Sequence, residues 1–188
     1  VTISYLTSND SSGAIVNEAG SNIIAGPITL TGGGGSTRIY SNAGTLTLSG
    51  PITANATGRT FKLMGVGSGY VTGNISDGST SNVVTLSKEE AGTWTLAGSN
   101  SHGGTTNVVA GTLVIAHPNA LGTGGTALGT NTSSTSITSG AVLDLNGQQG
   151  INEAITVRGT GIGSNGALVN NSTTAASIAA GMVASINT

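Results

Sequence analysis

Two histidines, seven carboxylates and five basic residues are the side chains of this chain that could do acid–base or metal chemistry. A metal site needs His, Asp or Glu ligands close together, and a glycosidase needs two carboxylates about 5 to 10 Å apart. His102 and His117 are the only histidines, and no cluster of carboxylates recurs near them. We therefore expect both to lie in surface turns and not to bind a metal.

The acidic residues are spread thinly along the sequence. Glu89 and Glu90 are adjacent, so on a strand they would point to opposite faces. We interpret Lys88, Glu89 and Glu90 as a solvated corner, where charge hinders off-register pairing. Asp144 and Arg158 could begin a calcium-dependent lyase site, but a surface ion pair is the simpler interpretation.

Glycine and serine do not complete a catalytic motif either. Residues 159–166 read GTGIGSNG, which resembles a phosphate-binding loop but lacks its lysine and the following helix. The G-x-S-x-G elbow with a histidine partner and the GGxGxD calcium repeat are both missing. The sequence thus predicts no catalytic residue, no cofactor, no metal and no enzymatic activity.

The composition favours stacked β-structure with little charge. Charged residues make up 6% of the chain, against about 25% in an average soluble domain. There are 32 glycines, 36% hydrophobic residues, no cysteine and a net charge of -2. The chain therefore has no basic stripe for nucleic acid, no disulfide or thiolate site, and no apolar run long enough to span a membrane.

A short strand pattern is written twice in the chain. Residues 44–50 read GTLTLSG and residues 92–98 read GTWTLAG, each with apolar side chains at alternate positions. Such alternation places the apolar side chains on one face of a strand. The prediction is an interior formed by the alternating residues of these and similar strands, which are Leu46, Leu48, Trp94, Leu96, Leu113, Ile115, Leu143 and Leu145.

Two all-β folds are compatible with these strands. A sandwich would use evenly spaced strands but would not need copied heptads. A parallel β-solenoid stacks each rung on the last, so like residues align in ladders. The copies and the glycine-rich corners between them favour a β-solenoid of roughly eight rungs.

A longer repeat is also suggested. GAIVN at residues 13–17 recurs as GALVN at residues 166–170, which indicates one unit of about 153 residues and the start of the next. We therefore expect residues 1–188 to be a single β-solenoid segment of a longer repetitive protein.

Outward Thr-x-Thr pairs, as in residues 45–47 and 93–95, invite comparison with ice-binding solenoids. The pattern is missing from the strands GTLVIA and AVLDLNG, so no continuous array follows, and a soluble β-surface is the simpler interpretation. Trp94 is the only tryptophan, and core packing is a simpler role for it than stacking on a sugar.

Residues 92–115, GTWTLAGSNSHGGTTNVVAGTLVI, resemble the autotransporter-associated β-strand repeat of bacterial passenger proteins. The landmarks are GTWTLAG, the GGT turn at 103–105 and AGTLV at 110–114, and residues 117–125 and 140–147 resemble the usual continuation. The resemblance implies a right-handed parallel β-helix that is secreted and displayed at the bacterial cell surface. It implies no particular activity, because such passengers include adhesins, proteases and structural stalks.

These observations favour a non-catalytic extracellular rod with a structural or adhesive role, as a segment of a bacterial surface passenger or fibre. The alternative is a carbohydrate-active β-helix that binds or cleaves polysaccharide, which clustered charges on one face would favour. The partners we expect are copies of the chain stacked head to tail, or further repeats, with cell-surface or matrix polysaccharide as a second partner.

Overall fold

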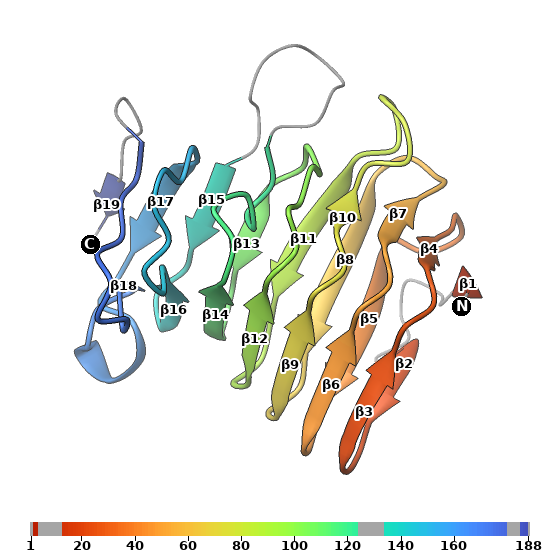
Figure 1. Cartoon of the computed structure of the whole chain (residues 1–188), viewed down its shortest axis with the longest axis horizontal. Coiled ribbons are helices and arrows are strands. Elements are labelled where there is room, and N and C mark those ends of the chain that lie inside the picture. Colours follow the sequence, from red (N-terminus) through yellow and green to blue (C-terminus); the bar gives the residue numbers. More distant parts are fainter. Residues whose placement is uncertain (1, 4–12, 124–133, 180–184, 188) are drawn as a thin grey trace.

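The computed structural model of the protein describes residues 2–3, 13–123, 134–179 and 185–187. Its strands wind through a stack of turns, and equivalent strands of successive turns lie side by side (Figure 1). Every strand pair in the described part of the chain is parallel. The predicted all-β parallel solenoid is therefore confirmed.

Three sheets form the sides of the stack. Sheet A has four strands, which are β1 (Thr2–Ile3), β4 (Ile28–Leu30), β7 (Ile52–Ala54) and β10 (Ile75–Ser76). Sheet B has eight strands, which are β2 (Ile15–Asn17), β5 (Ser36–Ser41), β8 (Arg59–Met64), β11 (Val84–Lys88), β13 (Thr106–Val108), β15 (Ser134–Ile137), β17 (Ala154–Arg158) and β19 (Ser185–Asn187). Sheet C has seven strands, which are β3 (Ser21–Ile24), β6 (Thr45–Leu48), β9 (Ser68–Val71), β12 (Thr93–Leu96), β14 (Gly111–Ile115), β16 (Ala141–Asp144) and β18 (Leu168–Val169).

Helical structure is limited to one short 3-10 turn in the described residues, Ile162–Ser164. No helix in this part of the chain is long and apolar enough to cross a membrane.

The copied heptads occupy equivalent places in the stack. Both lie in sheet C, as β6 and β12, with β9 between them. The register aligns Leu46 with Gly69 and Gly69 with Trp94, so the copies stand two turns apart in one inward column. All the residues expected in the interior are buried, which are Leu46, Leu48, Trp94, Leu96, Leu113, Ile115, Leu143 and Leu145.

Trp94 fits into the core because its register partner in the previous turn is a glycine, Gly69. A Cβ atom on Gly69 would overlap the indole ring, so only glycine leaves room for the ring at this point of the column. The indole Nε1 donates a hydrogen bond to the Met64 carbonyl at 3.0 Å. A fully buried Trp with a bonded N–H is a core residue, and stacking of Trp94 on a sugar is ruled out by its burial.

The corners between sheets B and C stack closely on one another. Gly44 has φ 71° and Gly65 has φ 99°, values that favour glycine. A Cβ at either position would also collide with the backbone carbonyl of the turn below, at Gly20 or Ser41 respectively. The glycine-rich corners are therefore required both by backbone conformation and by the close approach of successive turns.

The number of turns is slightly lower than expected, at about six instead of roughly eight rungs. The turns of the stack also differ in length. Gly111 pairs with Ala141 in the next turn, whereas Thr93 pairs with Thr112, so the later turn takes up far more sequence. Longer turns leave room for fewer of them in a chain of this length.

The two copies of the longer pattern lie in different sheets. Residues of GAIVN form β2 in sheet B, whereas residues of GALVN form β18 in sheet C. This placement does not test the unit of about 153 residues, which stays a prediction.

Candidate functional site

His102 does not lie in a surface turn, so that expectation is wrong. Its side chain is fully buried, and neither ring nitrogen has a hydrogen-bond partner of normal geometry among the residues that the structure describes. Gly122 of the next turn lies directly against the ring, because a Cβ there would come within about 3 Å of Cε1 and Nδ1. The segment that contains His102 continues the third side of the stack beyond β10, which is why its side chain faces the interior.

Burial determines the acid–base behaviour of His102. It lowers the pKa of His102 from 6.5 to about 4, and the Gly104 backbone and the Asp77 carboxylate act in the opposite direction. Asp77 itself accepts hydrogen bonds from the backbone N–H groups of Val84 and Gly103, at 2.8 and 2.9 Å. The imidazole is therefore neutral at pH 7 and has a carboxylate nearby that is already bonded to the backbone.

Acidification is expected to destabilise the fold through His102. An unfolded histidine titrates near 6.5 and the folded one near 4, so between these values the unfolded chain binds the extra proton. The contribution of His102 to the free energy of unfolding should be fully present above pH 6.5. It should fall by roughly 3 kcal/mol as the pH drops from 6.5 to 4. Urea unfolding across this range should show the loss in the wild type but not in His102→Gln.

His117 provides the matched control for that experiment. It lies half-buried in a turn, and its Nδ1 accepts a hydrogen bond from the backbone N–H of Asn119 at 3.0 Å. His117→Gln should keep the pH dependence of the wild type. If the free energies of unfolding of His102→Gln and His117→Gln depended on pH in the same way, burial of neutral His102 would not be the source of acid sensitivity.

Lys88 is also buried, and its interpretation as part of a solvated corner is wrong. It occupies the inward column of sheet B, in register with Leu63 on one side and Val108 on the other. Charge in the sequence suggested exposure, but the long side chain lies in the core with its ammonium group at the corner.

The Lys88 ammonium group donates all three of its hydrogen bonds to backbone carbonyls. Nζ donates hydrogen bonds to the carbonyls of Glu89, Glu90 and Ala110, at 2.9, 2.7 and 2.9 Å. Burial lowers the pKa of Lys88 to about 8, against the opposite influence of the Glu90 and Glu89 carboxylates. Lys88 therefore joins the corner of one turn to the corner of the next.

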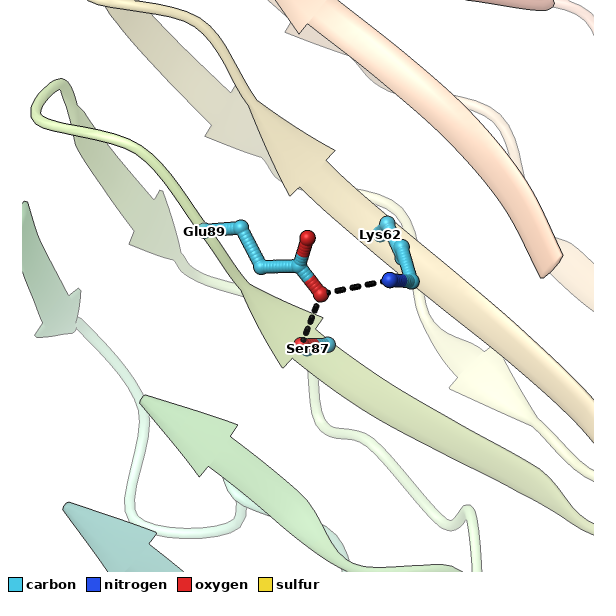
Figure 2. A network of polar contacts seen from close by, with 3 residues as sticks. All are labelled: Lys62, Ser87 and Glu89. Atoms are coloured by element: carbon cyan, nitrogen blue, oxygen red, sulfur yellow. Dashed lines mark hydrogen bonds and ion pairs between the residues drawn. The ribbon is translucent and has the colours of Figure 1, made fainter. Parts of the chain in front are cut away.

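Glu89 and Glu90 do not act as a pair. The Glu89 carboxylate accepts a hydrogen bond from Ser87 Oγ at 2.9 Å and forms an ion pair with Lys62 Nζ at 2.7 Å (Figure 2). Glu90 is exposed and accepts a hydrogen bond from the Gly65 N–H at 2.8 Å. Each carboxylate bonds to a different part of the previous turn, so no glycosidase-like pair forms here.

Asp144 does not form the expected surface ion pair with Arg158. The Asp144 side chain is buried, and its Oδ1 accepts hydrogen bonds from the backbone N–H groups of Asn146 and Asn171. Its Oδ2 accepts a third from Asn171 Nδ2 at 3.0 Å. Arg158 is exposed, and no ion pair joins it to Asp144 in the described part of the chain. Asp144 thus connects two turns and is not the start of a calcium site.

Several polar residues are buried without any signal in the sequence, and Asn100 and Thr106 are two of them. Asn100 Oδ1 accepts a hydrogen bond from the Ile75 N–H at 2.8 Å, and its Nδ2 donates to the Ala120 carbonyl at 2.6 Å. Thr106 Oγ1 donates to the Leu121 carbonyl at 3.0 Å. Asn and Thr are abundant in the exposed turns too, so nothing in one sequence separates these buried examples from the rest.

Residues 159–166 form a turn between β17 and β18, as expected, and not a phosphate loop. Several of these residues line a cavity of about 370 Å³. The cavity is lined by Val157, Gly159, Thr160, Ser164, Gly166, Ala167 and Leu168. None of these residues is titratable in the physiological range, so the cavity offers no acid–base chemistry.

The described residues contain no group of three or more His, Asp or Glu side chains that could hold a metal ion. The polar side chains with the strongest interactions, Lys88, Asn100 and Asp144, lie apart and bond to the backbone of neighbouring turns. What the residues build together is therefore a set of connections between turns and not one reactive centre.

Comparison with known families matched residues 86–115 to the passenger-associated-transport-repeat model. No curated protein and no solved structure matches the chain. The matched segment runs from β11 to the end of β14 and includes Lys88, Trp94, Asn100 and Thr106. The repeat and the parallel β-solenoid both fit a segment of an autotransporter passenger, a secreted or surface-exposed kind of protein. Residues 86–115 are thus an autotransporter passenger-associated repeat.

Proposed function

We propose that this chain is a non-catalytic rod with a structural or adhesive role outside the bacterial cell, within a surface passenger or fibre. The observation that carries the proposal is the hydrogen bonding of the buried polar side chains. Lys88, Asn100 and Asp144 each bond to backbone groups of an adjacent turn. Groups engaged in this way hold a stack of turns together and leave little with which to attack a substrate.

Polysaccharide cleavage is the less favoured candidate. Both oxygens of Asp144 accept hydrogen bonds, Glu89 pairs with Lys62, and Glu153 is buried. A general acid and a nucleophile must both reach a glycosidic bond. These carboxylates lie in different turns and have other partners, which supports a binding or structural role.

The ends of the stack supply the surfaces for head-to-tail association. Each sheet ends on strands that have one neighbour among the described residues, such as β3 and β18 in sheet C. A terminal strand of this kind presents unpaired N–H and C=O groups to a further strand. Contact between opposite ends of two copies is heterologous and does not close, so it extends into a filament.

The concentration dependence of sedimentation tests this association. At the two ends of β3, the carbonyls of Gly20 and Ile24 accept hydrogen bonds from the N–H groups of Thr45 and Ser49 in the next turn, each at 2.9 Å. Because these groups alternate along a parallel strand, the N–H of Ile23 points to the open edge. Ile23→Pro removes that donor without touching the ladder to β6, and we expect it to abolish a concentration-dependent rise in sedimentation coefficient.

Ile23→Thr is the matched control, because it changes the same exposed side chain and keeps the N–H. This variant should associate as the wild type does. A wild-type chain that remained monomeric at millimolar concentration would contradict head-to-tail association, and so would equal association by the proline and threonine variants.

A further inference from the structure

The outer face of sheet C, formed by the outward positions of β3, β6, β9, β12 and β14, is lined by uncharged side chains. The strand register aligns its side chains in two columns, one residue per turn. Seven Ser and Thr residues dominate it, which are Ser21, Thr45, Thr47, Ser68, Thr93, Thr95 and Thr112. Ile23, Tyr70 and Val114 supply its apolar groups.

Tyr70 lies in the middle of this face. Its register partners are Thr47 in the turn before and Thr95 in the turn after, at the strand spacing of about 4.8 Å. Tyr70 is 42% exposed, and Ile23 at the edge of the same column is 70% exposed. The phenol ring is therefore the largest group standing on a surface of smaller side chains, and it interrupts the Thr-x-Thr pattern.

The hydroxyl groups of this face have no hydrogen-bond partners among the described residues. None of the seven Ser and Thr side chains, and not the Tyr70 hydroxyl, makes a hydrogen bond to another residue in the described part of the chain. By contrast, several hydroxyls elsewhere, such as those of Thr106 and Thr138, donate to backbone carbonyls. The face therefore offers a regular row of donors and acceptors to a ligand.

Charge also separates this face from its neighbour. The outward positions of β3 to β14 in sheet C carry no charged side chain, whereas the outer face of sheet B carries Arg38, Lys62 and Glu89. An anionic polymer would find no cation on the face of sheet C and would meet a chain with a net charge of -2. The complementary ligand is thus uncharged and hydroxyl-rich.

We propose that the outer face of sheet C binds an extended, uncharged polysaccharide, with Tyr70 stacked against one sugar ring. The flanking hydroxyls of Thr47 and Thr95 exchange hydrogen bonds with sugar hydroxyls on either side. The columns of sheet C match an extended glycan because both repeat regularly and both present hydroxyl groups beside apolar groups. This inference deepens the adhesive role proposed above and rests on it, since it needs the face to be displayed outside the cell.

Affinity electrophoresis in gels that contain hydroxyethyl cellulose, a neutral soluble polysaccharide, tests the proposal. The wild type should be retarded in proportion to polymer concentration, and 0.5 M salt should not weaken the binding. Tyr70→Ala should raise the dissociation constant about tenfold, the effect expected for loss of one stacked aromatic ring. Tyr40→Ala, which removes the tyrosine on the outer face of sheet B, should change it less than about twofold.

Several results would overturn the inference. One is no retardation of the wild type in hydroxyethyl cellulose or in a second neutral glucan, and another is equal weakening by Tyr70→Ala and Tyr40→Ala. Retardation that occurred only in gels with dextran sulfate, and that disappeared when salt was added, would show that the protein binds an anionic polymer at a site other than this face. If Tyr70→Ala instead abolished self-association in the absence of polysaccharide, the face would be a contact between copies.

Failure of this inference is distinguishable from failure of the rod proposal. The Ile23→Pro experiment reads end-to-end association in the absence of any polysaccharide. A chain that associates normally but ignores neutral glucans would contradict only the glycan site, and a circular dichroism spectrum unchanged in Tyr70→Ala would show that the variant is folded.

Discussion

Trp94→Ala is expected to lower the free energy of unfolding by about 3 to 5 kcal/mol. The indole is fully buried and stands against Gly69, a residue with no side chain to move into the space. The core of a solenoid is narrow, so a cavity of this size cannot be filled by rearrangement of a second layer. The change also leaves the Met64 carbonyl without its donor at 3.0 Å.

Urea unfolding monitored by circular dichroism would measure this loss. Thr95→Ala is the matched control, because Thr95 is the next residue of the same strand and points outward. Its cost should be less than about 1 kcal/mol. Equal losses for the two variants would show that the inward and outward assignment of β12 is wrong.

Lys88→Ala is expected to have the second large effect, also about 3 to 5 kcal/mol. The change removes a buried side chain and leaves the carbonyls of Glu89, Glu90 and Ala110 without their shared donor. Lys88→Leu separates the two contributions, because Leu63 occupies the same inward column one turn away. The leucine variant should recover the packing but not the hydrogen bonds, so its stability should lie between those of wild type and Lys88→Ala.

Glu89→Gln is the control for charge at this corner. It weakens the Lys62–Glu89 ion pair, whose side chains are 23% and 21% exposed. A pair this close to solvent is expected to be worth less than about 1 kcal/mol. If Glu89→Gln cost as much as Lys88→Ala, the corner would depend on surface charge and not on the buried ammonium group.

The interior of the solenoid could be predicted from the sequence because two signals agreed there. The alternation in GTLTLSG and GTWTLAG defined an inward face, and copying of the heptad indicated that the two strands occupy equivalent places. Sheet C shows both, with Leu46 and Trp94 in one column. The number of turns was less accessible, because it depends on the lengths of connections that carry no periodic signal.

The polar residues could not be placed in the same way. The sequence predicts exposed corners for Lys88 and His102, because charged and polar side chains are seldom fully buried. In a stack of turns, however, the corners offer carbonyl groups at close range, and these satisfy the Lys88 ammonium in the interior. Such an exception becomes visible only when the backbone of the neighbouring turn is known.

The stacking of rungs in register is the central feature of this fold, and spin-label distances would test it. The chain has no cysteine, so introduced cysteines label selectively. Ile23, Val114 and Val169 lie in one outward column of sheet C, in the first, fifth and seventh strands. Labels at 23 and 114 should be about 19 Å apart, and labels at 23 and 169 about 29 Å. Distances that failed to increase in this order, or that were equal for the two pairs, would contradict the parallel solenoid.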